Sequence, residues 1–209
     1  MTFSEIYHGF ITGLQQSSWL EIIAAICGII SVWFSKKENI LVYPVGLINT
    51  IIYVYISFKY HLPGEASVNF YYTIMSFYGW YNWNKKDSIE KPLVRITYSD
   101  KRMLQQQVIF FLSFFIVLFF ALTKLKEQFF PGAIPWADAL ASAAAFTGMW
   151  MMTRKKVESW YWWLITNAFS IPLYFVKGLM ITSVYYFILL ILAVFGLSEW
   201  KQKARTAHD

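Results

Sequence analysis

Long apolar segments separated by short polar ones run through almost the whole chain. Seven such segments recur, each of 17 to 20 residues, and they span 19–35, 40–58, 66–83, 104–123, 136–152, 157–176 and 179–198. A helix of this length crosses a hydrocarbon core of about 30 Å, and most of the polar stretches between them are too short to fold separately. The pattern therefore predicts an all-α membrane protein with seven transmembrane helices.

The composition supports this class of protein. Of the 209 residues, 57% are hydrophobic, 21% are aromatic and only 14% are charged, a balance that is typical of membrane proteins. The single cysteine, Cys27, lies inside the first apolar segment and excludes an internal disulfide and a cysteine-based metal cluster. We expect residues 84–103 to form a polar linker. Residues 1–18 place apolar side chains at helical spacing and predict an interfacial helix, with a frayed tail as the alternative.

Basic residues gather at one set of segment ends. Of the 18 Lys and Arg residues, 14 lie on one side, and only four lie on the other: Lys59, Lys124, Lys126 and Lys177. Because basic loops are retained in the cytoplasm during insertion, we expect the amino terminus outside and both the 84–103 linker and the 201–209 tail in the cytoplasm. This topology accounts for the net charge of +6, so nucleic acid is not an expected partner.

Two stretches of the chain match each other at offsets of 116 to 118 residues. The aligned pairs include Trp19 with Trp136, Trp33 with Trp150, Asn49 with Asn167, Ser67 with Ser183, Gly79 with Gly196 and Trp83 with Trp200. Such repeats are common in transporters. We therefore expect a three-helix repeat at 19–83, a connector transmembrane helix at 104–123 and a second three-helix repeat at 136–200. The connector adds one membrane crossing, so this 3+1+3 duplication is parallel.

Polar and aromatic residues form a stripe on one of the apolar segments. Four residues at spacing i, i+4, i+7 and i+11 share one helical face: Trp163, Asn167, Ser170 and Tyr174. Pro172 frees a backbone carbonyl on the same helix. Shorter stripes occur in the first repeat, at Asn49, Tyr53, Asn69, Tyr72 and Trp80. We expect these stripes to face one another and to line a substrate-binding site.

Each of these residue types also has an ordinary structural explanation. Asn and Ser inside membranes often join helices by hydrogen bonds of about 0.6 to 2 kcal/mol. For Ser170, considered by itself, this structural interpretation is favoured. Tryptophans near helix ends usually lie at the membrane interface, where we expect Trp160, Trp162 and Trp200. The pair of Trp163 and Asn167 favours a binding site instead, because an indole can stack on a flat ring while an amide one turn away bonds its polar edge.

The residue types absent from the apolar segments restrict the chemistry. No Lys or Arg lies in the middle of a segment, so we expect an unphosphorylated cargo, and aromatic walls favour a flat aromatic cation. No catalytic constellation appears, which indicates a protein that is not an enzyme and needs no cofactor or metal. The acids Glu21, Asp138 and Glu199 lie at segment ends. A coupling ion would need a central titratable group, so we expect a uniporter.

Several long stretches resemble the bacterial nicotinamide riboside transporters of the Pnu vitamin transporter family. They read VYPVGLINTIIY, FYYTIMSFYGWYNW, WADALASAAAF, MMTRKKVESWYWWLITN and SIPLYFVKG, and the resemblance extends from about Trp19 to Lys201. It implies a SWEET-like three-helix unit, duplicated and assembled as a homotrimer in the bacterial inner membrane. It also implies facilitated diffusion of a vitamin that a cytoplasmic kinase then traps, with Trp163 and Asn167 at the ligand site.

The resemblance leaves the cargo open. Nicotinamide riboside and thiamine are both flat-ringed monocations that fit an aromatic site, and some members of the family are thought to carry thiamine or riboflavin. We expect nicotinamide riboside, with thiamine or riboflavin as the alternative. Two further classes stay open as well: a sugar facilitator built on the same three-helix unit, and a membrane scaffold that transports nothing.

Overall fold

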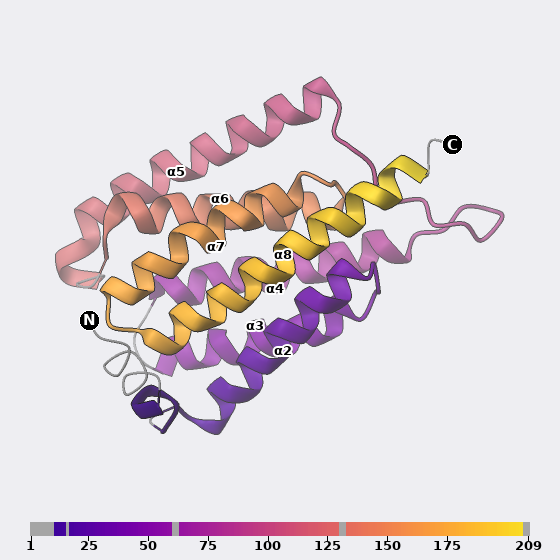
Figure 1. Ribbon diagram of the computed structural model, residues 1–209. Coiled ribbons are helices and arrows are strands. Elements are labelled where there is room, and N and C mark those ends of the chain that lie inside the picture. The colour runs from indigo at the N-terminus through magenta and orange to yellow at the C-terminus, as the bar shows by residue number, and fades with distance from the viewer. Residues whose placement is uncertain (1–10, 16, 60–62, 130–132, 207–209) are drawn as a thin grey trace.

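The computed structural model describes residues 11–15, 17–59, 63–129 and 133–206, and these residues are mainly helical (Figure 1). The long helices are α2 (Trp19–Lys36), α3 (Val42–Lys59), α4 (Pro63–Asn84), α5 (Lys101–Phe129), α6 (Pro135–Thr153), α7 (Ser159–Val176) and α8 (Met180–Thr206). Within the expected interfacial segment 1–18, residues 11–15 are helical, whereas residues 1–10 and 16 lie outside the described part.

Four of these helices are long and apolar enough to cross a membrane, namely α2, α3, α5 over residues 101–124, and α8. The protein is therefore an all-helical, multi-pass membrane protein. Helices α4, α6 and α7 have similar lengths of 22, 19 and 18 residues. They carry more polar residues, among them Asn69, Asp138 and Asn167. A lower hydropathy is expected where a helix is surrounded by protein rather than by lipid.

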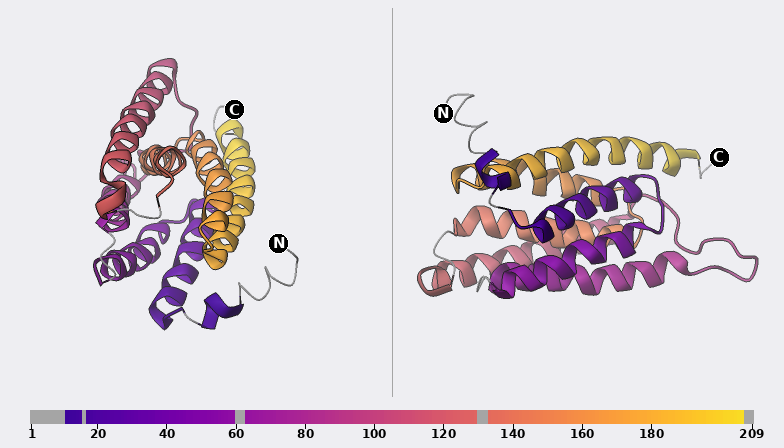
Figure 2. Two further views of the ribbon diagram at one scale, coloured as in Figure 1. Left: turned by 90° about the vertical axis from the view of Figure 1, so that its left-hand side faces the viewer. Right: turned by 90° about the horizontal axis from the view of Figure 1, so that it is seen from below.

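Six helices pack in a closed ring, and the seventh lies outside it. Helix α2 packs on α3, α3 on α4, α4 on α6, α6 on α7, α7 on α8, and α8 on α2 again, whereas α5 packs mainly on α6. Figure 1 shows α5 along one edge of the bundle. In Figure 2 the loop between α4 and α5 projects beyond the helices at one end. We name this the basic end, where α2, α4, α6 and α8 finish.

Helix α6 is built from small residues and lies among three other helices, α4, α5 and α7. Its buried positions include Ala137, Ala139, Ala141, Ala143, Ala144, Ala145 and Gly148. Small side chains allow helix axes to approach closely, which stabilises packing where lipid supplies no hydrophobic driving force. The composition of α6 therefore explains how one helix can serve both the ring and the outer helix α5.

Acidic side chains hold the starts of α2 and α6 at the end opposite the basic end. Glu21 and Ser18 form a capping box, in which the Glu21 carboxylate accepts from the Ser18 backbone N–H at 2.7 Å. Asp138 accepts from the Ile134 backbone N–H at 2.6 Å and pairs with Lys177 at 2.6 Å. Both acids thus have structural partners at helix ends, where a carboxylate also interacts well with the helix dipole.

The tryptophans expected at the membrane interface lie inside the protein instead. Trp160 is 1% exposed and Trp200 is 0% exposed, so the prediction for these two residues was wrong. Each belongs to a buried cluster at the basic end, where aromatic rings pack against helix backbones. Trp162 is partly buried and donates from its Nε1 to the Gln107 side chain at 2.9 Å, which ties α7 to α5.

Candidate functional site

The polar stripe of α7 faces the interior of the bundle. Asn167 is 2% exposed and Ser170 is also buried, while Trp163 and Tyr174 are partly buried. The Oδ1 atom of Asn167 is buried and has no hydrogen-bond partner among the described residues. An unpaired buried acceptor costs about 1 to 3 kcal/mol. Such an atom is therefore well placed to accept a hydrogen bond from a ligand.

Aromatic side chains of α4, α6 and α7 form a series of ring contacts that includes Trp163. The Tyr72 ring of α4 lies 6.3 Å from the Trp163 ring, between centroids, and the Phe146 ring of α6 lies 6.2 Å from Tyr72. On its other side the indole packs on the backbone of α6, because a Cβ at Gly148 would lie 3.3 Å from the Trp163 ring. Helices α4, α6 and α7 thus supply one aromatic wall beside the Asn167 amide.

Phe146 and Tyr71 belong to this wall, although the sequence patterns did not identify them. Their rings lie 4.5 Å apart, and the Tyr71 hydroxyl donates to the Phe146 carbonyl at 3.0 Å. Phe146 follows the run of alanines in α6. A single aromatic residue after small ones gives no periodic signal, so only the packing of α4 on α6 identifies it.

Two tyrosines of α8 form the opposite side of the site. The rings of Tyr186 and Tyr174 are stacked, with centroids 5.2 Å apart and an interplanar angle of 7°. Tyr72 lies close to both Tyr185 and Tyr186. The sequence patterns missed the α8 pair. The internal repeat could have identified Tyr185. The Ser-Val pairs at 67–68 and 183–184 match at an offset of 116 residues, and the residues that follow these pairs are Asn69 and Tyr185.

Asn49, which aligns with Asn167, has a different environment. Its Nδ2 donates to the Ala24 carbonyl of α2 at 2.6 Å. A Cβ at Gly28 would lie 2.9 Å from this Nδ2 and would also collide with the Tyr185 hydroxyl. Asn49 therefore already has a partner, and it joins α3 to α2 within reach of α8.

The remaining sequence-predicted residues lie around this centre. Tyr53 lies close to Tyr185, and Asn69 is partly buried and has an interaction partner. Trp80 packs, like Trp163, against the buried cluster at the basic end. The stripes of α3, α4 and α7 therefore converge on α8.

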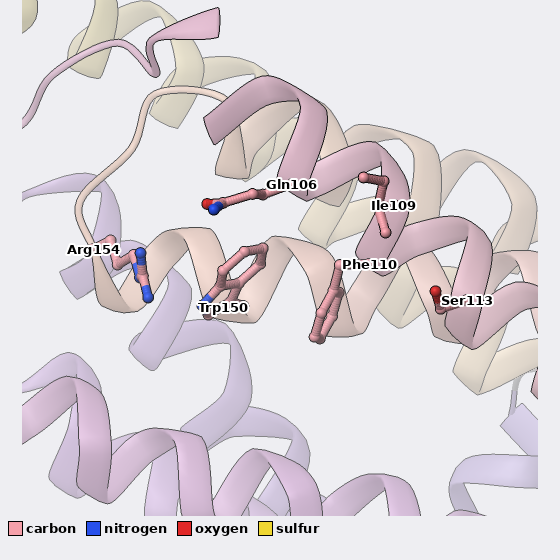
Figure 3. A pocket seen from close by; sticks show the side chains of 6 residues that line it. All are labelled: Gln106, Ile109, Phe110, Ser113, Trp150 and Arg154. Carbon is pink, nitrogen blue, oxygen red and sulfur yellow. The ribbon is translucent and has the colours of Figure 1, made fainter. Parts of the chain in front are cut away.

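The described surface hollows lie elsewhere. One, of about 480 Å³, opens between α5 and α6 and is lined by Gln106, Ile109, Phe110, Ser113, Trp150 and Arg154 (Figure 3). There the Phe110 and Trp150 rings are stacked with centroids 4.8 Å apart, and the Arg154 guanidinium lies 5.0 Å from the Trp150 ring centroid. None of the sequence-predicted site residues lines this hollow. It belongs to the outer surface of the bundle, and the interior contacts define the candidate site.

Comparisons with known proteins agree with this architecture. The family described as "Nicotinamide mononucleotide transporter" matches residues 18–202. The chain is 26% identical to the nicotinamide riboside transporter PnuC of Escherichia coli (strain K12) over 213 residues, which cover 92% of this chain and 89% of that protein. It is 25% identical to the riboflavin/roseoflavin transporter RibM of Streptomyces davaonensis, covering 91% and 88% of the two chains.

A solved structure has the same fold. It is described as the crystal structure of the vitamin B3 transporter PnuC, and it matches with a TM-score of 0.70 at 22% sequence identity. The match covers 99% of this chain and 94% of the other. The helix arrangement described above is therefore that of a known transporter structure.

Proposed function

Because this chain belongs to the nicotinamide mononucleotide transporter family, and is therefore a membrane transporter and not an enzyme, we propose that it carries nicotinamide riboside into the cytoplasm by facilitated diffusion. The observation that carries this proposal is the buried Oδ1 of Asn167 beside Trp163, which has no hydrogen-bond partner in the part of the chain that the structure describes. The carboxamide of nicotinamide offers N–H donors to such an acceptor, and its ring can stack on an indole.

The charge of the pyridinium ring fits the aromatic wall. The ring faces of Trp163, Tyr72 and Phe146 offer a cation attraction of about 0.5 to 2 kcal/mol each without a neutralising carboxylate. The Lys177 ammonium, by contrast, lies at the far end of α7, paired with Asp138. The Lys177 ammonium also lies 5.6 Å from the Tyr174 ring centroid at that end. A monocation beside Trp163 and Asn167 therefore meets electron-rich rings, and in the described helices no Lys or Arg lies next to these two residues.

The same distribution of charge argues for an unphosphorylated cargo. In the described helices, Lys and Arg lie in the end turns or, at Lys124 and Lys201, in the penultimate turns of α5 and α8, and not beside Trp163 and Asn167. A phosphate desolvated at this site would lack a charged partner, which is strongly unfavourable. We therefore expect the riboside to bind better than the mononucleotide that the family description names.

Riboflavin and thiamine are the alternative cargoes. The relative from Streptomyces is named as a riboflavin transporter, and riboflavin also combines a flat ring system with a polar N–H edge. Thiamine is a flat cation like nicotinamide riboside. The fused rings of riboflavin are larger, so the distinction rests on how much space opens between Trp163 and the α8 tyrosines when a ligand binds.

The proposed architecture is a parallel 3+1+3 duplication of a SWEET-like unit with seven transmembrane helices. The proposed units are residues 19–83 and 136–200, joined by the 84–103 linker and the 104–123 connector. The ring of contacts supports this arrangement, because α4 meets α6 and α8 meets α2, so that each unit touches the other by its third and first helices. Each of the proposed units then contributes one half of a central path.

We further propose that the amino terminus lies outside, that the basic end faces the cytoplasm of a bacterial cell, and that three copies assemble in the inner membrane. The positive charge of the basic end supports the orientation. Large apolar side chains on the outer face of α5, among them Ile109, Val117 and Phe120, are exposed. They offer a surface for lipid or for neighbouring copies.

A thermal-shift panel on the purified protein tests the cargo. It compares nicotinamide riboside, its mononucleotide, thiamine, riboflavin and glucose, each with the native protein and with Asn167→Ala. A ligand at 100 times its Kd should stabilise the native protein by about 2.7 kcal/mol. We expect the riboside alone to do so, and expect the effect to be reduced in the variant. A shift with riboflavin or thiamine only would assign the alternative cargo, and one with glucose would indicate a sugar facilitator.

Trapping by a cytoplasmic kinase is part of the proposal. A uniporter cannot concentrate its cargo, so uptake into proteoliposomes should stop when the inner and outer concentrations are equal. Adding a riboside kinase and ATP inside the vesicles should allow accumulation to continue, because phosphorylation removes free cargo. Continued accumulation without kinase would contradict this part of the proposal.

A further inference from the structure

The buried cluster at the basic end repeats the same aromatic pair twice. Tyr43 and Trp83 meet edge to face with centroids 5.1 Å apart and an interplanar angle of 85°. Trp160 and Trp200 do the same at 5.5 Å and 87°. These pairs are equivalent at the 117-residue offset of the internal repeat. The ring of Tyr43 lies against Gly79, and that of Trp160 lies against the equivalent Gly196.

Hydrogen bonds cross between the two repeats in the same symmetric way. Trp83 donates from its Nε1 to the Met152 carbonyl at 3.2 Å, and Trp200 donates to the carbonyl of Ser35, the equivalent residue, at 3.1 Å. The Ser35 hydroxyl also contacts the Met152 sulfur at 2.9 Å. Each repeat therefore holds the helix end of the other.

An ion pair completes this arrangement at the loops. Glu38 and Lys155 are equivalent positions with opposite charges, and both adopt left-handed backbone conformations, with φ of 59° and 50°. The Lys155 ammonium lies 2.8 Å from the Glu38 carboxylate and 4.6 Å from the Trp83 ring centroid. Lys155 is only 5% exposed. Lys203 approaches the same carboxylate at 3.3 Å.

The cluster lies between the candidate site and the basic end. Trp160 is almost one helical turn before Trp163 on α7, and the Trp163 side chain packs against the cluster. A cargo that leaves Asn167 toward the basic end must therefore pass these rings. Their present packing closes that route.

Two buried polar atoms indicate that this packing is not the only one the cluster adopts. The Tyr43 hydroxyl and the Trp160 Nε1 have no hydrogen-bond partner among the described residues, although both are buried. They are equivalent positions of the repeat. Donors left unpaired in a closed state gain partners when water enters, which favours opening.

We infer that this cluster is the inner gate of the transport path and that the Glu38–Lys155 pair is its latch. The inference rests on the proposed path between the two repeats. In each transport cycle the latch would separate, the rings would part over Gly79 and Gly196, and cargo would leave toward the basic end. The competing explanation is a permanent joint, which would hold the repeats together and never open.

Cross-linking across the latch distinguishes a gate from a joint. Glu38→Cys and Lys155→Cys are combined with Cys27→Ser, and the pair is joined in proteoliposomes by a short, reducible bifunctional thiol reagent. A gate predicts that cross-linking lowers nicotinamide riboside uptake by about tenfold or more and that a reductant restores it. Full uptake with the cross-link in place would overturn the inference, because a joint need not open.

The chain offers a matched control next to the latch. Lys156 donates to the Thr97 hydroxyl at 2.8 Å, a contact between the α6–α7 loop and the 84–103 linker that does not join the repeats. Cross-linking of Lys156→Cys with Thr97→Cys should leave uptake unchanged. If uptake is absent before cross-linking in every variant, including Cys27→Ser alone, the cargo assignment fails and the gate is tested by labelling instead.

Labelling of the site from each side of the membrane needs no cargo. The Asn167→Cys variant, in the Cys27→Ser background, is exposed to a membrane-impermeant thiol reagent in right-side-out and inside-out vesicles. Lys155→Gln should raise the labelling rate from the basic end by roughly tenfold, since it breaks a buried ion pair, whereas Lys156→Gln makes the same charge change and should not. Equal rates in the two variants would show that the latch does not control access.

Discussion

Two asparagines at equivalent positions of the repeat differ in the partners of their side chains. Asn49 is bonded to the Ala24 carbonyl, whereas the Asn167 oxygen has no partner in the described part of the chain. The first residue therefore contributes to the stability of the bundle. The second leaves a buried acceptor without a partner among the described residues, which costs stability and is the arrangement expected if a ligand binds there.

Asn167→Ala should separate binding from stability. We expect ligand affinity to fall by about 1 to 3 kcal/mol, measured by calorimetry, while the ligand-free melting temperature is unchanged or higher because an unpaired buried acceptor has been removed. Asn49→Ala is the contrasting variant. It removes a hydrogen bond that joins α3 to α2 and should lower the melting temperature. Unchanged affinity in Asn167→Ala would contradict the site assignment.

Trp163→Ala should remove the stacking surface for the cargo ring. We expect a loss of about 1 to 3 kcal/mol in binding free energy, and a smaller loss for Trp163→Phe, which keeps an aromatic face. Trp150→Ala is the matched control, because Trp150 lies on the outer hollow between α5 and α6. Titration calorimetry measures the binding free energy of the three variants. An equal effect of Trp150→Ala would show that the losses are structural.

At the scale of the helices, the site depends on the close approach of α8 to α2, on which it packs. Gly28 of α2 permits this approach, since a Cβ there would meet the Tyr185 hydroxyl and the Asn49 amide. These contacts bring side chains from both repeats together. A helix pair that packs through a glycine has little space to absorb an added methyl group.

Gly28→Ala should therefore lower stability by about 1 to 3 kcal/mol, and Tyr185→Phe should restore part of the loss by removing the hydroxyl. Melting temperatures of the two single variants and of the double variant form a complete cycle. Purely additive effects would mean that the two side chains do not interact and that the approach of α8 to α2 is looser than described.

At the scale of the whole molecule, the positions of the acids argue against ion coupling. Glu21 caps α2, and Asp138 binds Ile134 and Lys177. Glu199 lies near Lys36 and Lys37 at 3.9 and 3.8 Å, at the basic end. All three acids have partners at helix ends, and none lies in the middle of a helix, where an ion-coupling group is expected.

We therefore expect uniport. In proteoliposomes loaded with unlabelled nicotinamide riboside, labelled cargo should exchange inward at a rate that is indifferent to protonophore and to replacement of sodium. An imposed potential should act only through the charge of the cargo itself, about 2.3 kcal/mol per elementary charge per 100 mV. Accumulation driven by a proton or sodium gradient, with no kinase inside, would show that a coupling site exists.

The sequence predicted the helices better than their ends. The apolar segments 104–123 and 179–198 correspond to α5 and α8, yet these helices run over Lys101–Phe129 and Met180–Thr206. Hydropathy reports where apolar side chains stop, whereas a helix continues as long as its backbone bonds are favourable, also in water. Polar residues such as Lys203 and Arg205 extend α8 without any apolar signal.

The candidate site was predictable where its residues lie on one helix. Trp163 and Asn167 share a face through the helical period, which is local information. Phe146, Tyr185 and Tyr186 join the site only because α6 and α8 pack against α7. Their contribution depends on contacts between helices, and hydrophobic periodicity along a single helix does not predict such contacts.

The sequence by itself determined the class of protein, the internal repeat and the stripe that carries Asn167, because composition, repetition and spacing are properties of the chain alone. Only the tertiary structure decided which of the two equivalent amides, Asn49 and Asn167, has a hydrogen-bond partner among the described residues. It also placed Trp160 and Trp200 in a buried cluster instead of at the membrane interface. Equivalent residues acquire different roles when the two repeats pack together, since a hydrogen bond needs its acceptor in place as well as its donor.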